Sequence, residues 1–365
     1  MSLKAGIVGL PNVGKSTLFN AITKKQILIA NYPFATIEPN VGIVTVPDYR
    51  MANLEKIYMP LELKPATFEF VDIAGIVKGA SLGEGLGNKF LSHIREVDAI
   101  IEVVRCFDDG NITHVEGKTD PVRDVSIINL ELSLADLEII NNRIDKIKKK
   151  AETTKDKDAL LELNTLIKSK ESLEKDVPLR LVDYTKEELF SIKAYNFLTL
   201  KPHIFLANIK EEEIGTENDY VKKLREYASI SNDKVIVISA KIESELSELE
   251  DSEKEEMLKE LGIEKSGLDN VINAAYSILG LETYFTCGDK EVKAWTFKTG
   301  MNAKECAGII HSDFEKGFIK AEVISYNDLI DAGSEQKVKE NGKFRIEGKD
   351  YLMQDGDICH FRFNL

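Results

Sequence analysis

The stretch that most constrains the fold is GLPNVGKST, which follows the apolar segment AGIV. It places Gly9, Gly14, Lys15 and Ser16 in the pattern Gly-x-x-x-x-Gly-Lys-Ser. Glycines at this spacing let successive backbone N–H groups curl around a phosphate, the lysine reaches the β- and γ-phosphates, and the serine hydroxyl binds Mg²⁺. A helix starting there directs its positive dipole end at the phosphates. The pattern predicts a nucleoside triphosphate site.

This phosphate loop supplies the first group of predicted site residues. The residues expected to contact the nucleotide are Asn12, Val13, Gly14, Lys15, Ser16 and Thr17. Lys15 is also a predicted catalytic residue, because a fixed positive charge stabilises a transferring phosphoryl group.

Short apolar runs recur along the chain between segments of helix length. They cover residues 5–8, 68–72, 99–105, 203–208 and 235–239. Strands rich in Val and Ile at this spacing are typical of a mostly parallel sheet with helices on both faces. We therefore expect an α/β core of the P-loop class.

Further motifs follow the loop in a fixed order. Asp72-x-x-Gly75 ends a predicted strand, so that Asp72 would orient the Mg²⁺ shell through water and the Gly75 N–H would meet the γ-phosphate. Between the loop and this strand, Thr36 is placed to close over Mg²⁺ when the third phosphate is present. Asn208-x-x-Glu211 and later Ser239-Ala240 each follow a strand. This order is that of the switch GTPases.

Several longer stretches resemble one family. DIAGIVKGASLGEGLGNKFLSHIREVDAI looks like the Obg group of translation-associated GTPases, and KEVKAWTFKTG, DFEKGFIKAEVISY and EGKDYLMQDGDICHFRFNL narrow the resemblance to the YchF or Obg-like ATPase family. The resemblance implies an OBG-type G domain at 1–129 and 200–279. It also implies an inserted helical coiled-coil domain at 130–199 and a C-terminal TGS domain, a β-grasp α+β module, at 280–365.

The residue pattern places boundaries at the same points. Apolar residues at helical spacing begin at Leu130 and predict an antiparallel helical hairpin, followed by a short helix with a capping box of Thr185 and Glu188. After Gly280 the chain alternates as β-structure around one helical stretch. Trp295, Phe297, Phe361 and Phe363 lie on these strands, where we expect core packing rather than base stacking.

The base-recognition motif departs from the guanine pattern Asn-Lys-x-Asp. Its residues Asn208, Ile209 and Glu211 are predicted to contact the base, as are Ser239 and Ala240. Glu is one methylene longer than Asp, so its carboxylate cannot accept the two guanine hydrogen bonds in the same geometry. Adenine presents a donor amine and an acceptor nitrogen, which Asn208 and nearby backbone would satisfy beside an apolar Ile209. The motif and the family resemblance both favour ATP, with GTP bound more weakly.

The position that carries a water-orienting Gln in Ras-like proteins is Ile76 here. A hydrophobic side chain cannot orient water, so intrinsic hydrolysis should be slow. His114, in the loop THVEGKTDP, is the predicted substitute, because an imidazole can orient or deprotonate water. Asn12 resembles the Asn of potassium-activated relatives and predicts that K⁺ accelerates hydrolysis.

Several functions remain open from the sequence. The favoured one is a Mg²⁺-dependent ATPase that acts as a molecular switch and docks in its ATP form to the ribosome, its large subunit, RNA or protein. The alternatives are a GTP-specific Obg-like GTPase and a nucleotide-gated binding module with negligible turnover. A metabolic kinase would need an acceptor pocket that the sequence does not reveal.

Composition narrows the partners. The net charge of −14 argues against wrapping duplex nucleic acid, so we expect no DNA partner. No apolar run has the length of a membrane span and no signal-peptide pattern opens the chain, so a cytoplasmic location without a membrane partner is expected. The 4 cysteines are far apart and indicate neither disulfides nor zinc.

Overall fold

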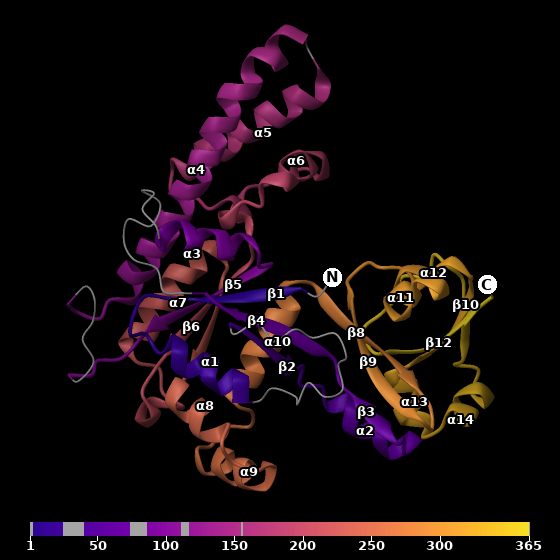
Figure 1. Ribbon diagram of the computed structural model, residues 1–365. Coiled ribbons are helices and arrows are strands. Elements are labelled where there is room, and N and C mark those ends of the chain that lie inside the picture. Colours follow the sequence, from indigo (N-terminus) through magenta and orange to yellow (C-terminus); the bar gives the residue numbers. More distant parts are fainter. Residues whose placement is uncertain (1–2, 25–39, 74–85, 111–116, 155, 365) are drawn as a thin grey trace. The chain divides into compact units, whose positions relative to one another are not determined.

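The computed structural model describes residues 3–24, 40–73, 86–110, 117–154 and 156–364 (Figure 1). These residues fall into two compact units, each made of two separate stretches of chain. Unit 1 contains Met1–Gly42 and Glu69–Val271, and unit 2 contains Ile43–Phe68 and Ile272–Leu365.

The sheet that carries the predicted site has the strand order β2-β4-β1-β5-β6-β7. Its strands are β1 (Lys4–Val8), β2 (Val41–Thr45), β4 (Thr67–Asp72), β5 (Ala99–Arg105), β6 (His203–Asn208) and β7 (Lys234–Ile238). The pairings of β1 with β4 and β5, and of β6 with β5 and β7, are all parallel. Every residue of β5 and β6 is buried, as expected for central strands covered on both faces. The α/β prediction is confirmed.

Helices connect these strands or follow the last of them. They include α1 (Lys15–Lys24), α3 (Leu86–Arg95), α7 (Asp219–Ser231), α8 (Ala240–Leu246), α9 (Asp251–Glu260) and α10 (Gly267–Ile278). α1 begins at the lysine of the phosphate loop and buries Leu18, Phe19 and Ile22. The strand, loop and helix that the motif requires are therefore present in that order.

The predicted helical hairpin consists of α4 (Pro121–Thr154) and α5 (Lys157–Leu173), which run side by side (Figure 1). α4 begins at Pro121, ahead of the expected start at residue 130, because proline is well suited to the first helical position. The short helix α6 (Lys186–Ile192) has the predicted capping box of Thr185 and Glu188. Buried Asp136 accepts hydrogen bonds from the backbone N–H groups of Leu198 and Thr199 at 3.0 and 2.8 Å, which fixes the base of the hairpin.

Unit 2 is built on a sheet of order β11-β10-β12-β8-β9-β3. Its strands are β3 (Glu62–Lys64), β8 (Leu281–Cys287), β9 (Glu291–Lys298), β10 (Phe318–Ser325), β11 (Arg345–Glu347) and β12 (Asp357–Phe363). β8 and β9 form an antiparallel hairpin, while the last strand β12 pairs parallel with β8. Helix α11 (Ala303–Ile310) packs into the core beside them. This is the arrangement of a β-grasp fold.

The remaining helices of unit 2 are α2 (Tyr49–Tyr58), α12 (Ser312–Lys316), α13 (Tyr326–Ala332) and α14 (Glu335–Glu340). The chain also has short 3₁₀ turns at Leu179–Leu181, Lys193–Tyr195, Leu198–Leu200 and Glu211–Glu213.

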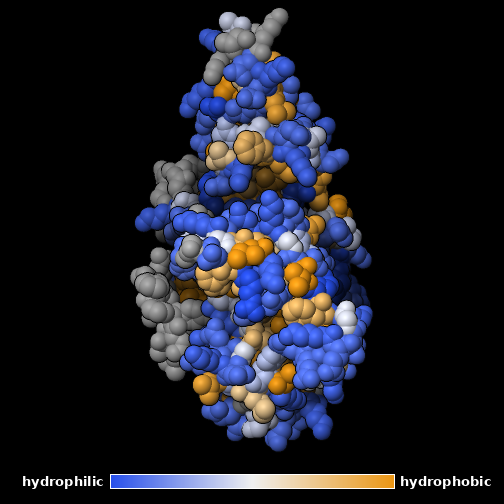
Figure 2. All heavy atoms as spheres, turned by 90° about the vertical axis from the view of Figure 1, so that its right-hand side faces the viewer, coloured by the Kyte–Doolittle hydropathy of each residue, from blue (hydrophilic) through white to orange (hydrophobic). Residues whose placement is uncertain are grey.

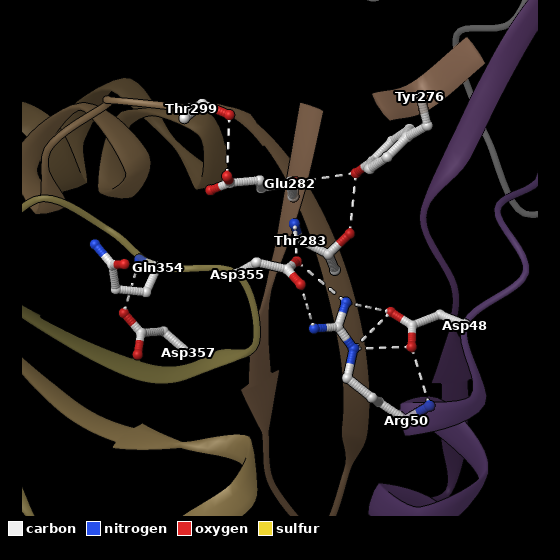
Figure 3. Close-up of polar contacts among 9 residues, drawn as sticks. All are labelled: Asp48, Arg50, Tyr276, Glu282, Thr283, Thr299, Gln354, Asp355 and Asp357. Carbon is white, nitrogen blue, oxygen red and sulfur yellow. Dashed lines mark hydrogen bonds and ion pairs between the residues drawn. The ribbon is translucent and has the colours of Figure 1, made fainter. Parts of the chain in front are cut away.

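Residues 43–68 are an integral part of unit 2. β3 pairs parallel with β9, with Leu63 opposite Val292. Arg50 pairs with Asp48 at 2.7 Å and with Asp355 at 2.8 Å, and the Asp355 carboxylate also accepts the Thr283 backbone N–H at 2.9 Å (Figure 3). The guanidinium is thus held by two carboxylates, one of which is anchored on β8.

The aromatic residues of unit 2 are mainly core residues. Phe297 and Phe361 are buried in the cluster around Tyr284. Trp295 packs against the same cluster, and its indole N–H donates to the Thr286 hydroxyl at 2.9 Å. The core interpretation of these strands is therefore confirmed for the buried aromatics, and Phe363 stacks on another side chain at the surface.

The face of the molecule in Figure 2 is largely hydrophilic, and its hydrophobic residues form small separate patches. Within the described ranges, no helix is long and apolar enough to cross a membrane. The described cysteines carry no disulfide, and three of them, Cys106, Cys306 and Cys359, are buried.

Candidate functional site

A cavity of about 370 Å³ lies in unit 1 where the parallel strands end at their carboxyl edge. This edge is the usual position of ligand sites in open α/β sheets. The lining residues come from the phosphate loop and from the segments after β5, β6 and β7. They are Asn12, Gly14, Thr17, Phe107, Asp109, Asn208, Ile209, Lys210, Glu211, Glu212, Ser239, Ala240 and Lys241. Most of the predicted nucleotide-binding residues are therefore brought together.

The phosphate loop depends on glycine for steric reasons. Gly14 has a φ of +99°, and a Cβ added there would lie 2.3 Å from the Asn208 Nδ2 atom. Asn12 also has a positive φ, 64°. A Cβ on Gly9 would lie 2.8 Å from the Val103 carbonyl oxygen. The loop can take this curled conformation and close packing only because its two motif glycines lack side chains.

Asn208 connects the phosphate loop to the segment after β7. Its Nδ2 donates to the Val13 carbonyl at 2.8 Å, and its Oδ1 accepts the Ala240 N–H at 2.9 Å. The side chain is buried, so these bonds form in a site of low dielectric. The motif predicts a contact of Asn208 with the base but gives no sign of this connection. Asn208 and the phosphate loop are far apart in the sequence and meet only in the folded chain. A base contact by Asn208 stays a prediction.

Lys15 and Asp72 meet at the phosphate end of the site. The Lys15 ammonium pairs with the Asp72 carboxylate, and both side chains are mostly buried. They are 57 residues apart in the sequence, and the parallel pairing of β1 with β4 places the strand ends together. Ser16, in the first turn of α1, is exposed. Lys15 and Asp72 are thus brought together, and the Asp72 carboxylate and Ser16 hydroxyl carry oxygens of the kind that Mg²⁺ prefers.

The base-recognition residues differ in their surroundings. Ile209 is only 3% exposed and belongs to a core cluster beside Val104 and Ala207, although it also lines the cavity. Glu211 is the first residue of a 3₁₀ turn, and its Oε2 lies 2.6 Å from the Lys241 Nζ atom. The hydrogen bond to Glu211 is the main cause that raises the pKa of Lys241. A contact of Ile209 or Glu211 with the base stays a prediction.

The segment after β5 forms a wall of the cavity that sequence reasoning missed. Buried Arg105 donates to the carbonyl oxygens of Phe107 at 3.0 Å and Asp109 at 3.3 Å. Its guanidinium lies 4.8 Å from the centre of the Phe107 ring. Arg105 therefore helps to hold the aromatic wall in place, as does the Thr119 hydroxyl, which donates to the Phe107 carbonyl at 3.2 Å. No local motif marks Phe107, because its role depends on the loops beside it.

The two residues after β7 are positioned as predicted at the cavity. The Ser239 hydroxyl is buried and has no hydrogen-bond partner among the described residues. Ala240 begins α8, which lies beside α1 (Figure 1). A buried hydroxyl next to the cavity is available to a ligand's polar edge.

Four residues named from the sequence lie outside the described ranges. They are Thr36, Gly75, Ile76 and His114. Their predicted roles in metal closure, γ-phosphate binding and water orientation stay predictions. Within the described residues there is no cluster of three or more His, Cys, Asp or Glu side chains suited to a metal ion.

Comparisons with known proteins cover both units. A family model described as a 50S ribosome-binding GTPase matches residues 4–130, and the YchF-GTPase_C model, described as a protein of unknown function, matches residues 281–364. The chain is 59% identical to the Ribosome-binding ATPase YchF of Bacillus subtilis (strain 168), over 100% of both chains. The chain belongs to the YchF family. The predicted family resemblance is thereby confirmed.

Other YchF family members agree over the same length. The proteins named Ribosome-binding ATPase YchF in Haemophilus influenzae and Escherichia coli O157:H7 are 55% and 52% identical over all of both chains. The structure of the Schizosaccharomyces pombe YchF GTPase matches with a TM-score of 0.90 and 42% identity, covering 99% of this chain and 98% of that one. The YchF fold therefore extends over both units. The relatives' names differ in the nucleotide that they imply.

Proposed function

We propose that this chain is a Mg²⁺-dependent ATPase that serves as a molecular switch and binds the ribosome. The observation that carries the proposal is that Glu211 lines the same cavity as the phosphate loop, at the position where guanine sites carry Asp. The phosphate loop keeps its motif residues, whereas the guanine-reading motif carries Glu211 in place of Asp. The names of the bacterial relatives support both ATP and the ribosome.

Lys15, Ser16 and Asp72 would hold the triphosphate and its metal. Lys15 would leave its partner Asp72 for the β- and γ-phosphate oxygens, since phosphates bring more negative charge than one carboxylate. The Ser16 hydroxyl would bind Mg²⁺ directly and Asp72 would act through water. When bound, Mg²⁺ would neutralise negative charge on the phosphates. The first-turn N–H groups of α1 add their dipole to the same end of the site.

The cavity favours a purine of the adenine type. Phe107 and the stem of Lys210 offer apolar surface to a planar ring, and the Ser239 hydroxyl and local backbone offer hydrogen bonds. Because guanine needs an Asp-type acceptor for its N1–H and amine, GTP should bind more weakly than ATP.

Hydrolysis is proposed to be slow. The position after Gly75 is Ile76, so His114 remains the proposed water-orienting group and Asn12 the proposed K⁺ ligand. Slow turnover together with a helical hairpin and a β-grasp module suits a switch in which hydrolysis limits the lifetime of the ATP form. The proposed docking partner is the ribosome, with RNA or protein contacts through the TGS and helical domains, and the proposed location is the cytoplasm.

Two measurements test the proposal. Titration of the purified chain with labelled ATP and GTP should give clearly tighter ATP binding, and tighter GTP binding would leave the GTP-specific alternative. Co-sedimentation with ribosomes should be stronger with a non-hydrolysable ATP analogue than with ADP. Equal sedimentation in both nucleotides would contradict the switch.

A further inference from the structure

Lys241 occupies a position that the base-recognition motif does not include. It lies in the first turn of α8, directly after Ser239 and Ala240, and Glu211 lies in the turn that follows β6. β6 and β7 are adjacent parallel strands, so their ends bring the two side chains together. The Nζ–Oε2 distance is 2.6 Å, and both residues line the cavity.

The neighbouring glutamates do not pair with Lys241 as Glu211 does. The Glu213 carboxylate accepts the backbone N–H of Lys210 at 3.2 Å and so belongs to its own turn. Glu211 is the first cause of the raised pKa of Lys241, with Glu245 and Glu212 adding smaller charge effects. Lys241 is therefore committed mainly to Glu211.

A paired carboxylate is a poor acceptor for guanine. To use Glu211 for the guanine N1–H and amine, GTP would have to separate it from the Lys241 ammonium or share it. ATP makes no such demand, because the adenine edge lacks that pair of donors. A protein can gain specificity by making the binding of the wrong ligand cost free energy.

We propose that Lys241 is a positioning residue for base selection, which holds the Glu211 carboxylate away from the purine edge and so disfavours GTP. This rests on the proposed preference for ATP and adds a residue that sets it. The pair is partly exposed, with 65% of the Lys241 side chain and 35% of the Glu211 side chain accessible. Exposed ion pairs are weak, so the expected change in the ATP-to-GTP affinity ratio is about two- to fivefold.

The test uses the full-length chain with non-hydrolysable ATP and GTP analogues. Lys241→Gln should raise the affinity for the GTP analogue relative to the ATP analogue by this factor, and Lys241→Arg should restore the wild-type ratio. In a Glu211→Gln background, Lys241→Gln should no longer change the ratio. High salt should shift the wild-type ratio toward that of Lys241→Gln, because it screens the pair.

Lys222→Gln is the matched control, since Lys222 forms an exposed pair with Asp219 at 3.2 Å outside the cavity. It should leave the ratio unchanged. Loss of both affinities in equal measure, no change in the ratio, or the same change without Glu211 would each overturn the proposal. Wild-type preference for GTP would instead contradict the proposed function, and that result is read from the wild-type titration alone.

Discussion

At the scale of single residues, Asn208 connects two loops that line the same cavity. Its amide nitrogen donates to the Val13 carbonyl, and its amide oxygen accepts the Ala240 N–H. The phosphate loop and the start of α8 are therefore fixed to each other by one side chain. Loss of the Asn208 side chain should therefore weaken the binding of every nucleotide.

Asn208→Ala should weaken ATP and GTP analogues alike. It leaves two buried backbone groups without their partner, at a cost of about 1–3 kcal/mol each, so a loss of tenfold or more is expected in direct binding measurements. Asn218→Ala is the control, because Asn218 also donates to a backbone carbonyl, that of Cys106, but does not line the cavity. A loss confined to one nucleotide would contradict the connecting role.

Gly14→Ala should abolish nucleotide binding for two separable reasons. The added Cβ would meet Asn208 and would also be strained at a φ of +99°. Gly215→Ala shares the positive φ, +80°, but has nothing within 4 Å of the added Cβ. It should cost about 1 kcal/mol of stability and leave binding intact, as measured by unfolding and titration. Equal effects of the two substitutions would show that strain alone matters.

Sequence reasoning worked for residues that belong to short motifs. Lys15 and Asp72 were paired in function because their motifs have fixed chemistry, and the structure brings them into contact. Lys241 was missed because its pairing with Glu211 joins the ends of two different strands, and Arg105 was missed because its bonds to the carbonyl groups just after it belong to no sequence motif. The sequence contains these residues but not the distances between them.

At the scale of elements, β5 and β6 are joined by a buried pair of titratable side chains. The His203 Nε2 lies 3.0 Å from the Glu102 Oε2, and both side chains are fully buried. Burial, followed by the charge of Arg180, lowers the pKa of His203 well below its ordinary 6.5. Burial raises the pKa of Glu102 well above its ordinary 4.5.

These shifts act on stability in opposite directions. In the unfolded chain His203 takes up a proton below pH 6.5 that the folded chain refuses, so its contribution is lost as the pH falls below that value. Glu102 releases a proton on unfolding above pH 4.5, so its contribution is lost as the pH rises above that value. The two effects oppose each other between these pH values.

His203→Gln should isolate the histidine contribution. Relative to this variant, the wild type should lose about 1 kcal/mol of unfolding free energy between pH 7.5 and pH 5.5. Chemical denaturation at both pH values measures the difference. Glu102→Gln should give the opposite sign, with the wild type losing stability relative to the variant as the pH rises. A pH-independent difference for His203→Gln would mean that the pKa of His203 is the same in the folded and unfolded chains, and a wild type that gains stability toward low pH would mean that His203 is protonated in the folded chain.

Arg50 stabilises the packing of α2 within unit 2. Its side chain is 13% exposed and holds Asp48 and Asp355 together (Figure 3). Arg50→Ala should cost about 2 kcal/mol in denaturant unfolding, because it leaves carboxylates without their partner. Arg362→Ala is the matched control, since the Arg362 side chain is half exposed in its pair with Glu322 and its loss should cost clearly less. Equal losses would contradict a special role for Arg50.

At the scale of the whole molecule, the two units should open separately. The amides of β3 should exchange with solvent together with those of β9, and not with those of β5, because β3 is paired to β9. Native-state hydrogen exchange measures this directly. Arg50→Ala should speed exchange in β3 and β9 while β5 stays unchanged. Exchange of β3 in step with β5 would contradict this division.

Sequence patterns predict only part of the division of the chain into two units. The α/β core, the hairpin and the C-terminal β-structure follow from periodicity within each segment. The membership of residues 43–68 in unit 2 does not, because a three-residue strand such as β3 carries almost no pattern of its own. The predicted domain limits at 130, 200 and 280 stay predictions about sequence modules, while the structure groups the chain by packing.

The pairing of β3 with β9 also determines when unit 2 can fold during synthesis of the chain. Lys64 contacts Glu291 at 2.8 Å across 227 residues of sequence. At a synthesis rate of about 5–20 residues per second, β3 leaves the ribosome roughly 10–45 seconds before its partner strand exists. β3 stays without its partner strand through that interval, while the strands of unit 1 are still being made. The second unit can therefore be completed only when almost the whole polypeptide has been translated.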